Sequence, residues 1–124
     1  MKQDNGRILI VNTQSAYAEF LKRNIEMAFP ALEIMVAESG EAALELVNRS
    51  NYDLIITDLM LPGMGGLNLF YELKGRYPWL KTILLSDSLD IKRVKVLKQQ
   101  GLFGYVEKPF LMENLSDLIT HAIG

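Results

Sequence analysis

The sequence contains no cysteine, so disulfide bonds, thiolate nucleophiles and cysteine-based zinc sites are all excluded. No apolar run approaches the length needed to cross a membrane, and the N-terminal MKQDNGR lacks the apolar stretch of a signal peptide. Positive charge is not in excess, because the formal net charge is −2. That charge argues against bulk attraction to nucleic acid or to an anionic membrane. These absences predict a cytoplasmic protein.

The 124 residues do contain enough apolar material for one folded domain, with 49% hydrophobic and 23% charged residues. No repeat, linker or low-complexity segment divides the chain. We therefore expect one domain over residues 1–124, with a core over about residues 7–123.

Five short apolar runs occur along the chain, the second weaker than the others, at residues 8–11, 33–37, 54–56, 82–86 and 103–106. Runs of Ile, Val and Leu without alternation are typical of strands buried on both faces of a parallel sheet. Segments with helical spacing follow them, near residues 17–28, 39–47, 67–73, 90–101 and 110–122. Ser39 and Asp90 are candidate helix caps, and Gly101 is a candidate helix stop. The pattern predicts a single doubly wound α/β domain, with helices on both faces of a five-stranded parallel sheet.

In open sheets of this kind, ligands bind beyond the carboxyl ends of the strands. The residues at those ends are Asn12, Thr13, Asp58, Ser86, Asp87 and Lys108. Asp58 is a candidate nucleophile or metal ligand, and Ser86 is a candidate hydroxyl donor. Lys108 is a cation that can hold a phosphate or pair with Asp58. Each residue alone also fits a turn or a solvated side chain, but together they indicate a site.

Three stretches resemble the receiver domain of two-component response regulators: DLIITDLMLPGMGGLNLF at 53–70, TILLS at 82–86 and GYVEKPF at 104–110. The resemblance runs from about residue 7 to residue 123. It implies a flavodoxin-like topology with strand order 2-1-3-4-5. It also implies a signalling module of a phosphorelay rather than an enzyme.

The resemblance implies a role for each matching residue. Asp58 would accept a phosphoryl group from a histidine kinase or a phosphotransfer protein. Ser86 and Lys108 would contact the phosphoryl oxygens, and Tyr105 would change rotamer when Ser86 moves. Asp58 and the backbone carbonyl of Met60 would be ligands of Mg²⁺, the cofactor expected in the family.

The chain departs from the family after its first strand, where Asn12 and Thr13 stand at positions that are normally both acidic. Mg²⁺ prefers carboxylate ligands, because neutral oxygens offset the cost of its dehydration less well than charged ones do. We therefore expect a weak or absent Mg²⁺ site. Asp87, directly after Ser86, is a candidate substitute acid, and a solvated loop residue is its alternative. Lys108 is a candidate to stand in partly for the metal.

Two hypotheses of function remain open from the sequence. The first is phosphoacceptance at Asp58, which the other retained site residues favour. The second is a degenerate receiver that binds a protein or dimerises without phosphorylation, with Lys108 paired to Asp58 only structurally. A flavodoxin-type flavin site is disfavoured, because the NTQS segment lacks the glycine of such phosphate loops and the Asp58–Ser86–Lys108 set has no use there.

The segment predicted as the fourth helix is basic, with four cations at Lys92, Arg93, Lys95 and Lys98. A solvated face is the simpler interpretation, and a partner surface is the functional one. In the family, the fourth helix, fifth strand and fifth helix form the face for a downstream protein, an output domain or a homodimer. Four charges without aromatic residues make a poor footprint for nucleic acid, so we expect no direct contact with it.

Overall fold

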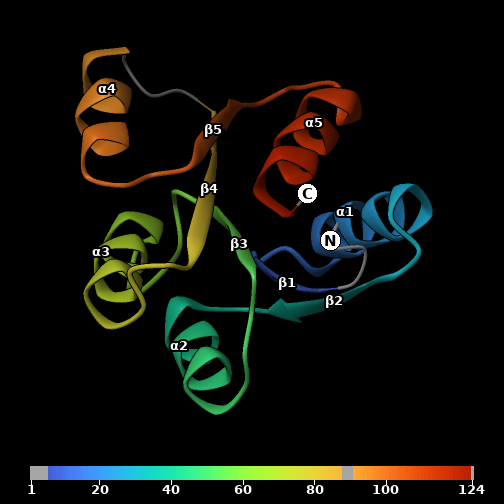
Figure 1. Ribbon diagram of the computed structural model, residues 1–124, viewed down its shortest axis with the longest axis horizontal. Helices are drawn as coiled ribbons and strands as arrows, with labels where there is room; N and C mark the ends of the chain where they lie inside the picture. The colour runs from blue at the N-terminus through green and yellow to red at the C-terminus, as the bar shows by residue number, and fades with distance from the viewer. Residues whose placement is uncertain (1–5, 88–90, 124) are drawn as a thin grey trace.

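The computed structural model describes residues 6–87 and 91–123, in which strands and helices alternate (Figure 1). The strands are β1 (Gly6–Val11), β2 (Leu32–Ala37), β3 (Leu54–Asp58), β4 (Lys81–Ser86) and β5 (Gly104–Glu107). The helices are α1 (Ser15–Ala28), α2 (Gly40–Arg49), α3 (Gly66–Arg76), α4 (Ile91–Gln99) and α5 (Met112–Ile123). Within the described residues, none of these helices has the length and apolar character of a membrane span.

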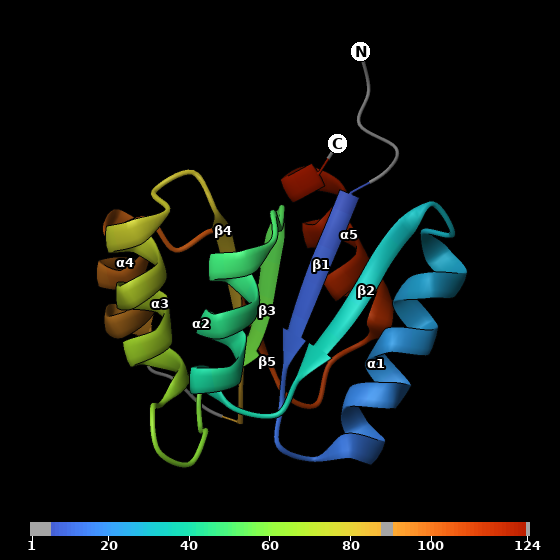
Figure 2. The ribbon, with the colours of Figure 1, turned by 90° about the horizontal axis from the view of Figure 1, so that it is seen from below.

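The sheet is parallel throughout, and its strands are ordered β2-β1-β3-β4-β5, so the predicted topology is confirmed. The register keeps the strand ends level with one another. Asp58 on β3 pairs with Leu85 on β4, and Ser86 pairs with Glu107 on β5. The carboxyl ends of the strands therefore lie together at one end of the sheet (Figure 2).

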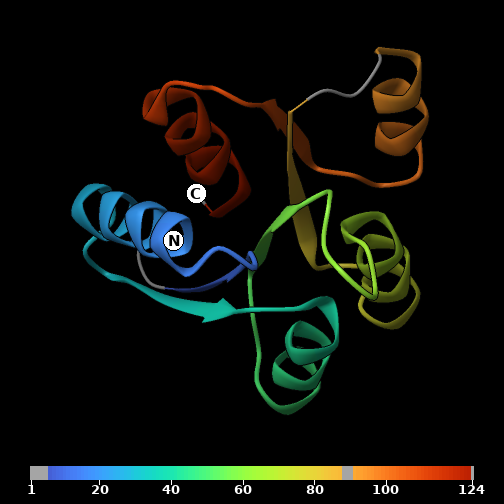
Figure 3. The ribbon, with the colours of Figure 1, turned by 180° about the vertical axis from the view of Figure 1, so that it is seen from behind.

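The two faces of the sheet are covered by different helices. Helices α1 and α5 lie on one face, and α2, α3 and α4 lie on the other (Figures 1 and 3). On β1, Ile8 and Ile10 join the core cluster of α1 and α5, whereas Leu9 and Val11 join the cluster of α2 and α3. Each of these side chains is fully buried, and such burial contributes about 1.5–3 kcal/mol per side chain. Burial on both faces explains why the strand sequence does not alternate.

The strand ends extend beyond the apolar runs that predicted them. Strand β3 continues through Thr57 and Asp58, because these residues pair with Leu84 and Leu85 of β4. The apolar run stops at residue 56, but Asp58 was predicted to end this strand, and the strand pairing confirms that prediction. Strand β5 is shifted by one residue to Gly104–Glu107, because the polar Glu107 pairs with Ser86 of β4.

The helix ends agree with the sequence where a cap is visible. The Ser39 hydroxyl accepts a hydrogen bond from the Ala42 N–H at 3.0 Å, as predicted for an N-cap. Helix α4 spans Ile91–Gln99. It ends before Gly101, whose φ of +106° suits glycine. The other predicted cap, Asp90, lies outside the described residues.

Gly66 begins α3 in direct contact with the end of β3. Its N–H donates a hydrogen bond to the Leu59 carbonyl at 2.9 Å. A β-carbon at this position would lie far inside contact distance of the Asp58 carbonyl oxygen. Because that oxygen belongs to the backbone, it cannot move aside as a flexible side chain would. The glycine therefore allows α3 to start against the residue that ends β3.

We expect Gly66→Ala to lower the free energy of unfolding by about 1–3 kcal/mol, the usual cost of forcing an extra carbon into a packed site. Gly75→Ala, in the same helix, is the matched control, because nothing lies within 4 Å of its added β-carbon. There, alanine should raise the free energy of unfolding by up to about 1 kcal/mol. Urea denaturation of both variants measures the difference. Equal stabilities would contradict the close packing at Gly66.

Candidate functional site

Asp58 and Lys108 meet at the carboxyl end of the sheet. The Lys108 Nζ lies 2.7 Å from Asp58 Oδ1, and the two side chains are 22% and 17% exposed. The two groups form a close ion pair, and partial burial limits its screening by salt. The Lys108 backbone N–H also donates to the Ser86 carbonyl at 2.7 Å, which fixes the segment after β5 beside the end of β4. The predicted pairing of Lys108 with Asp58 is therefore present.

Ser86 and Tyr105 come from the two strands that follow Asp58 across the sheet. Ser86 is buried and lies one residue beyond Leu85, the partner of Asp58. The Tyr105 hydroxyl is buried and, within the described part of the chain, makes no hydrogen bond. Burial raises the pKa of Tyr105, and the negative charge of Glu107 raises it further. A neutral phenol is therefore held on β5, opposite Leu84 of β4.

Asn12 lies beside Asp58, because β1 pairs with β3 up to the residue before each of them. It is only 2% exposed. Its N–H donates to the Ala37 carbonyl at 3.0 Å, and its Oδ1 accepts a hydrogen bond from the Gln14 N–H at 2.8 Å. Asn12 thus caps the turn that leads into α1. Thr13 is exposed on that turn. Neither residue adds a charge to the site.

The donor set does not fit a divalent cation. Asp58 is already paired with Lys108, and the amide oxygen of Asn12 is already bonded to the backbone. Asp87 is exposed and lines the cavity that Tyr17 and Lys108 also line, and Met60, whose backbone carbonyl was the predicted ligand, belongs to the loop after β3. Within residues 6–87 and 91–123, no group of three Asp, Glu or His residues is arranged to hold a metal. Mg²⁺ demands near-octahedral oxygen coordination, which these residues do not provide.

Tyr17 is a site residue that the sequence analysis did not identify as one. The centre of its ring lies 4.9 Å from the Lys108 Nζ, within the range of a cation–π contact. Burial raises the pKa of Tyr17, the positive charge of Lys108 lowers it, and Asp58 and Asp87 raise it. The signal in the sequence was its place in the first turn of α1. Side chains in a helix tilt towards its N-terminus, which here faces the carboxyl end of the sheet.

The loop that follows Asp58 is fixed on its other side by α2. Glu41, in the first turn of α2, accepts a hydrogen bond from the Met64 N–H at 3.1 Å. Gly63, just before, has a φ of +72°, a conformation that suits glycine. No sequence pattern predicts this contact, because the two residues are 23 positions apart.

The four basic residues predicted as a partner face lie on α4 and are exposed, namely Lys92, Arg93, Lys95 and Lys98. Apolar side chains lie among them. Ile91 is 74% exposed and Val96 is 49% exposed, and both line a groove that reaches Tyr71 of α3. The face therefore combines positive charge with apolar surface.

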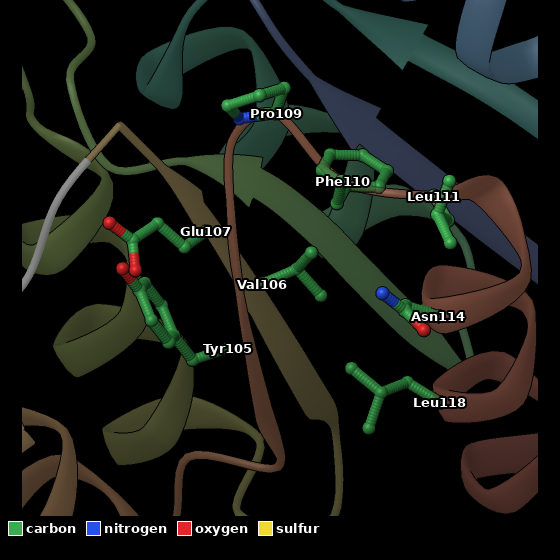
Figure 4. A pocket seen from close by; sticks show the side chains of 8 residues that line it. All are labelled: Tyr105, Val106, Glu107, Pro109, Phe110, Leu111, Asn114 and Leu118. Carbon is green, nitrogen blue, oxygen red and sulfur yellow. The ribbon is translucent and has the colours of Figure 1, made fainter.

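A second hollow, of about 660 Å³, lies along β5 and the start of α5 (Figure 4). Tyr105 and Glu107 project from one side of β5, and Val106 projects from the other, towards Asn114 and Leu118 of α5. In the described part of the chain, β5 pairs only with β4, so its outer edge has no partner strand there. The site at Asp58 is thus connected through a short strand to an open surface.

The family profile of the response regulator receiver domain matches residues 8–120, and the chain belongs to this family. The chain is 32% identical to the response regulator protein FleR of Pseudomonas aeruginosa and to the DNA-binding transcriptional regulator NtrC of Klebsiella pneumoniae. These matches cover 96% and 95% of the chain, but only 25% of each relative. The chain thus spans about a quarter of the length of these curated relatives.

Solved structures show the same fold. The response regulator protein TrrA of Thermotoga maritima, solved in complex with Mg²⁺-BeF, is 31% identical, with a TM-score of 0.81. The match covers 98% of this chain and 99% of that protein. A response regulator receiver domain protein from Clostridium thermocellum is 27% identical, with a TM-score of 0.85, over 95% of this chain and 94% of that one.

Asn12→Ala should lower the free energy of unfolding by about 1–2 kcal/mol, because the Gln14 N–H loses its acceptor. Thr13→Ala, at the neighbouring exposed position, should change it by less than about 0.5 kcal/mol. Thermal and urea denaturation of the two variants, compared with the parent chain, measure both effects. If the two variants were equally stable, the capping role of Asn12 would be wrong.

Proposed function

We propose that this receiver domain accepts a phosphoryl group on Asp58 from a phosphohistidine of a kinase or a phosphotransfer protein. The observation that carries the proposal is the short Asp58–Lys108 ion pair at the carboxyl end of the sheet, with Ser86 on the adjacent strand. A nucleophilic carboxylate, a cation and a hydroxyl from three consecutive strands and their ends suit the transfer of a phosphoryl group, which depends mostly on position and charge.

In the proposed transfer, a carboxylate oxygen of Asp58 attacks the phosphorus of the donor. The new O–P bond forms as the N–P bond of phosphohistidine breaks, and the electron pair of that bond goes to the imidazole nitrogen, which takes a proton from water. Lys108 then lies where it can neutralise charge on the phosphoryl oxygens, since it already contacts Asp58. Ser86 would donate a hydrogen bond to another of those oxygens. No step in this scheme requires a metal ion.

Tyr105 supports a conformational response to that chemistry. A buried hydroxyl without a hydrogen-bond partner costs about 1–3 kcal/mol, so a rotamer that finds a partner competes with the observed one. The ring packs against a cluster that includes Leu97 of α4. A change of rotamer would therefore alter the surface of α4 and β5, where a downstream protein, an output domain or a second copy of the domain would bind.

A second function is favoured by one specific observation, the absence of charge at Asn12 and Thr13. With Asp58 already neutralised by Lys108, the site is also complete as a structural ion pair. In that case the domain would act without phosphorylation, as a protein-binding or dimerisation module through α4, β5 and α5. In both schemes we propose a non-enzymatic signalling role in the cytoplasm, without direct contact with nucleic acid.

Incubation with a small-molecule phosphodonor, followed by intact mass spectrometry, separates the two functions. We expect a gain of one phosphoryl group in the parent chain and none in Asp58→Asn, because the amide cannot act as the nucleophile. A phosphotransfer protein that carries a phosphohistidine serves as the second donor, to test for transfer from phosphohistidine. If neither donor labels the parent chain, phosphoacceptance is wrong and the phosphorylation-independent function stands.

A further inference from the structure

Lys108 is held over Asp58 from several sides. Its ammonium contacts the Asp58 carboxylate at 2.7 Å, and the Tyr17 ring lies 4.9 Å away. Its own backbone N–H is bonded to the Ser86 carbonyl, so the base of the side chain is also fixed. The long, flexible side chain of lysine loses conformational freedom when it is held in one place. Because the Tyr17 ring and the Ser86 carbonyl already hold Lys108 in place, the lysine loses less conformational freedom when it pairs with Asp58.

The aromatic ring has a particular electrostatic effect on this lysine. The face of a tyrosine ring is negative, so it attracts an ammonium without adding a net charge. Tyr17 stacks with Phe20, their ring centres 6.3 Å apart, and both belong to α1. Tyr17 and Lys108 also line one cavity, of about 390 Å³, between α1 and the segment after β5. The ring therefore stabilises the position of the cation from the side of α1.

A divalent cation at Asp58 would compete with this lysine. It would have to take the carboxylate oxygen from Lys108, and the ammonium would have to leave the Tyr17 ring or remain beside a like charge. Asn12, the neighbour on β1, offers an amide oxygen that already accepts the Gln14 N–H. Neutral ligands of this kind would attract the ion too weakly to offset the free energy that it loses on dehydration.

We infer that Lys108, held by the Tyr17 ring, is the resident cation of Asp58 in this protein, and that Tyr17 is a positioning residue that keeps Mg²⁺ out of the site. The inference concerns how Asp58 is neutralised in the resting protein. It does not rest on phosphoacceptance, since the ion pair exists whether or not Asp58 ever reacts.

Titration with Mg²⁺, followed through backbone amide chemical shifts in NMR, tests the inference on four chains. The parent chain should show no saturable change near Asp58. The double variant Asn12→Asp/Thr13→Asp restores two carboxylates, and an aspartate at 12 keeps an acceptor oxygen for the Gln14 N–H. This variant should bind Mg²⁺. The remaining two chains add Tyr17→Leu or Tyr17→Phe to the double variant.

Addition of Tyr17→Leu should tighten Mg²⁺ binding by about two- to fivefold, which corresponds to the loss of a cation–π contact of about 0.5–1 kcal/mol. Tyr17→Phe keeps the ring and should leave the affinity of the double variant unchanged. A merely structural role for Tyr17 would not separate leucine from phenylalanine in this way.

Three results would overturn the inference. The first is saturable Mg²⁺ binding to the parent chain with an affinity equal to that of the double variant. The second is equal affinity of the leucine and phenylalanine chains. The third is no binding by any variant, since the site would then stay closed even after the ring is removed. Amide spectra recorded before the titration show whether each chain is folded, and Tyr17→Met replaces Tyr17→Leu if the leucine chain is not.

Discussion

Asp58 and Lys108 meet because the register of a parallel sheet brings the ends of β3 and β5 to the same level, on either side of β4. Their ion pair sets the charge of the whole site. With Asn12 neutral beside it, the carboxylate has one cation and no acidic neighbour on β1. The behaviour of the site towards anions and metals therefore depends on how firmly one lysine is held.

Much of the fold was accessible from the sequence, because strands buried on both faces leave apolar runs and their alternation with helices leaves few topologies. The strand-end residues followed from the same logic. The end of β3 at Asp58 agrees with the sequence, in which Asp58 was identified as a strand-end residue although the apolar run stops at residue 56. The Tyr17–Lys108 contact was missed, since it joins residues 91 positions apart and tyrosine at that position fits an apolar helix stripe equally well.

Asn12 has a structural role at the end of β1. Its amide oxygen accepts a hydrogen bond from the Gln14 N–H, and the residue is only 2% exposed. Asn12 therefore contributes to the stability of the turn that leads into α1. The Tyr17 ring, in the first turn of that helix, lies beside the ammonium of Lys108 that pairs with Asp58.

The contact between Glu41 and Met64 ties the loop after Asp58 to α2, and Gly66 presses the start of α3 against the Asp58 carbonyl. Asp58 is thus held in place on the side of α2 and α3. On its other side, among residues 6–87 and 91–123, the Tyr105 hydroxyl has no hydrogen-bond partner and the outer edge of β5 has no paired strand. A change at Asp58 is opposed by the backbone contacts at Met64 and Gly66 on one side. On the other side, the Tyr105 side chain can change its rotamer. A structural change that starts at Asp58 is therefore transmitted towards the surface of β5 rather than towards α2 and α3.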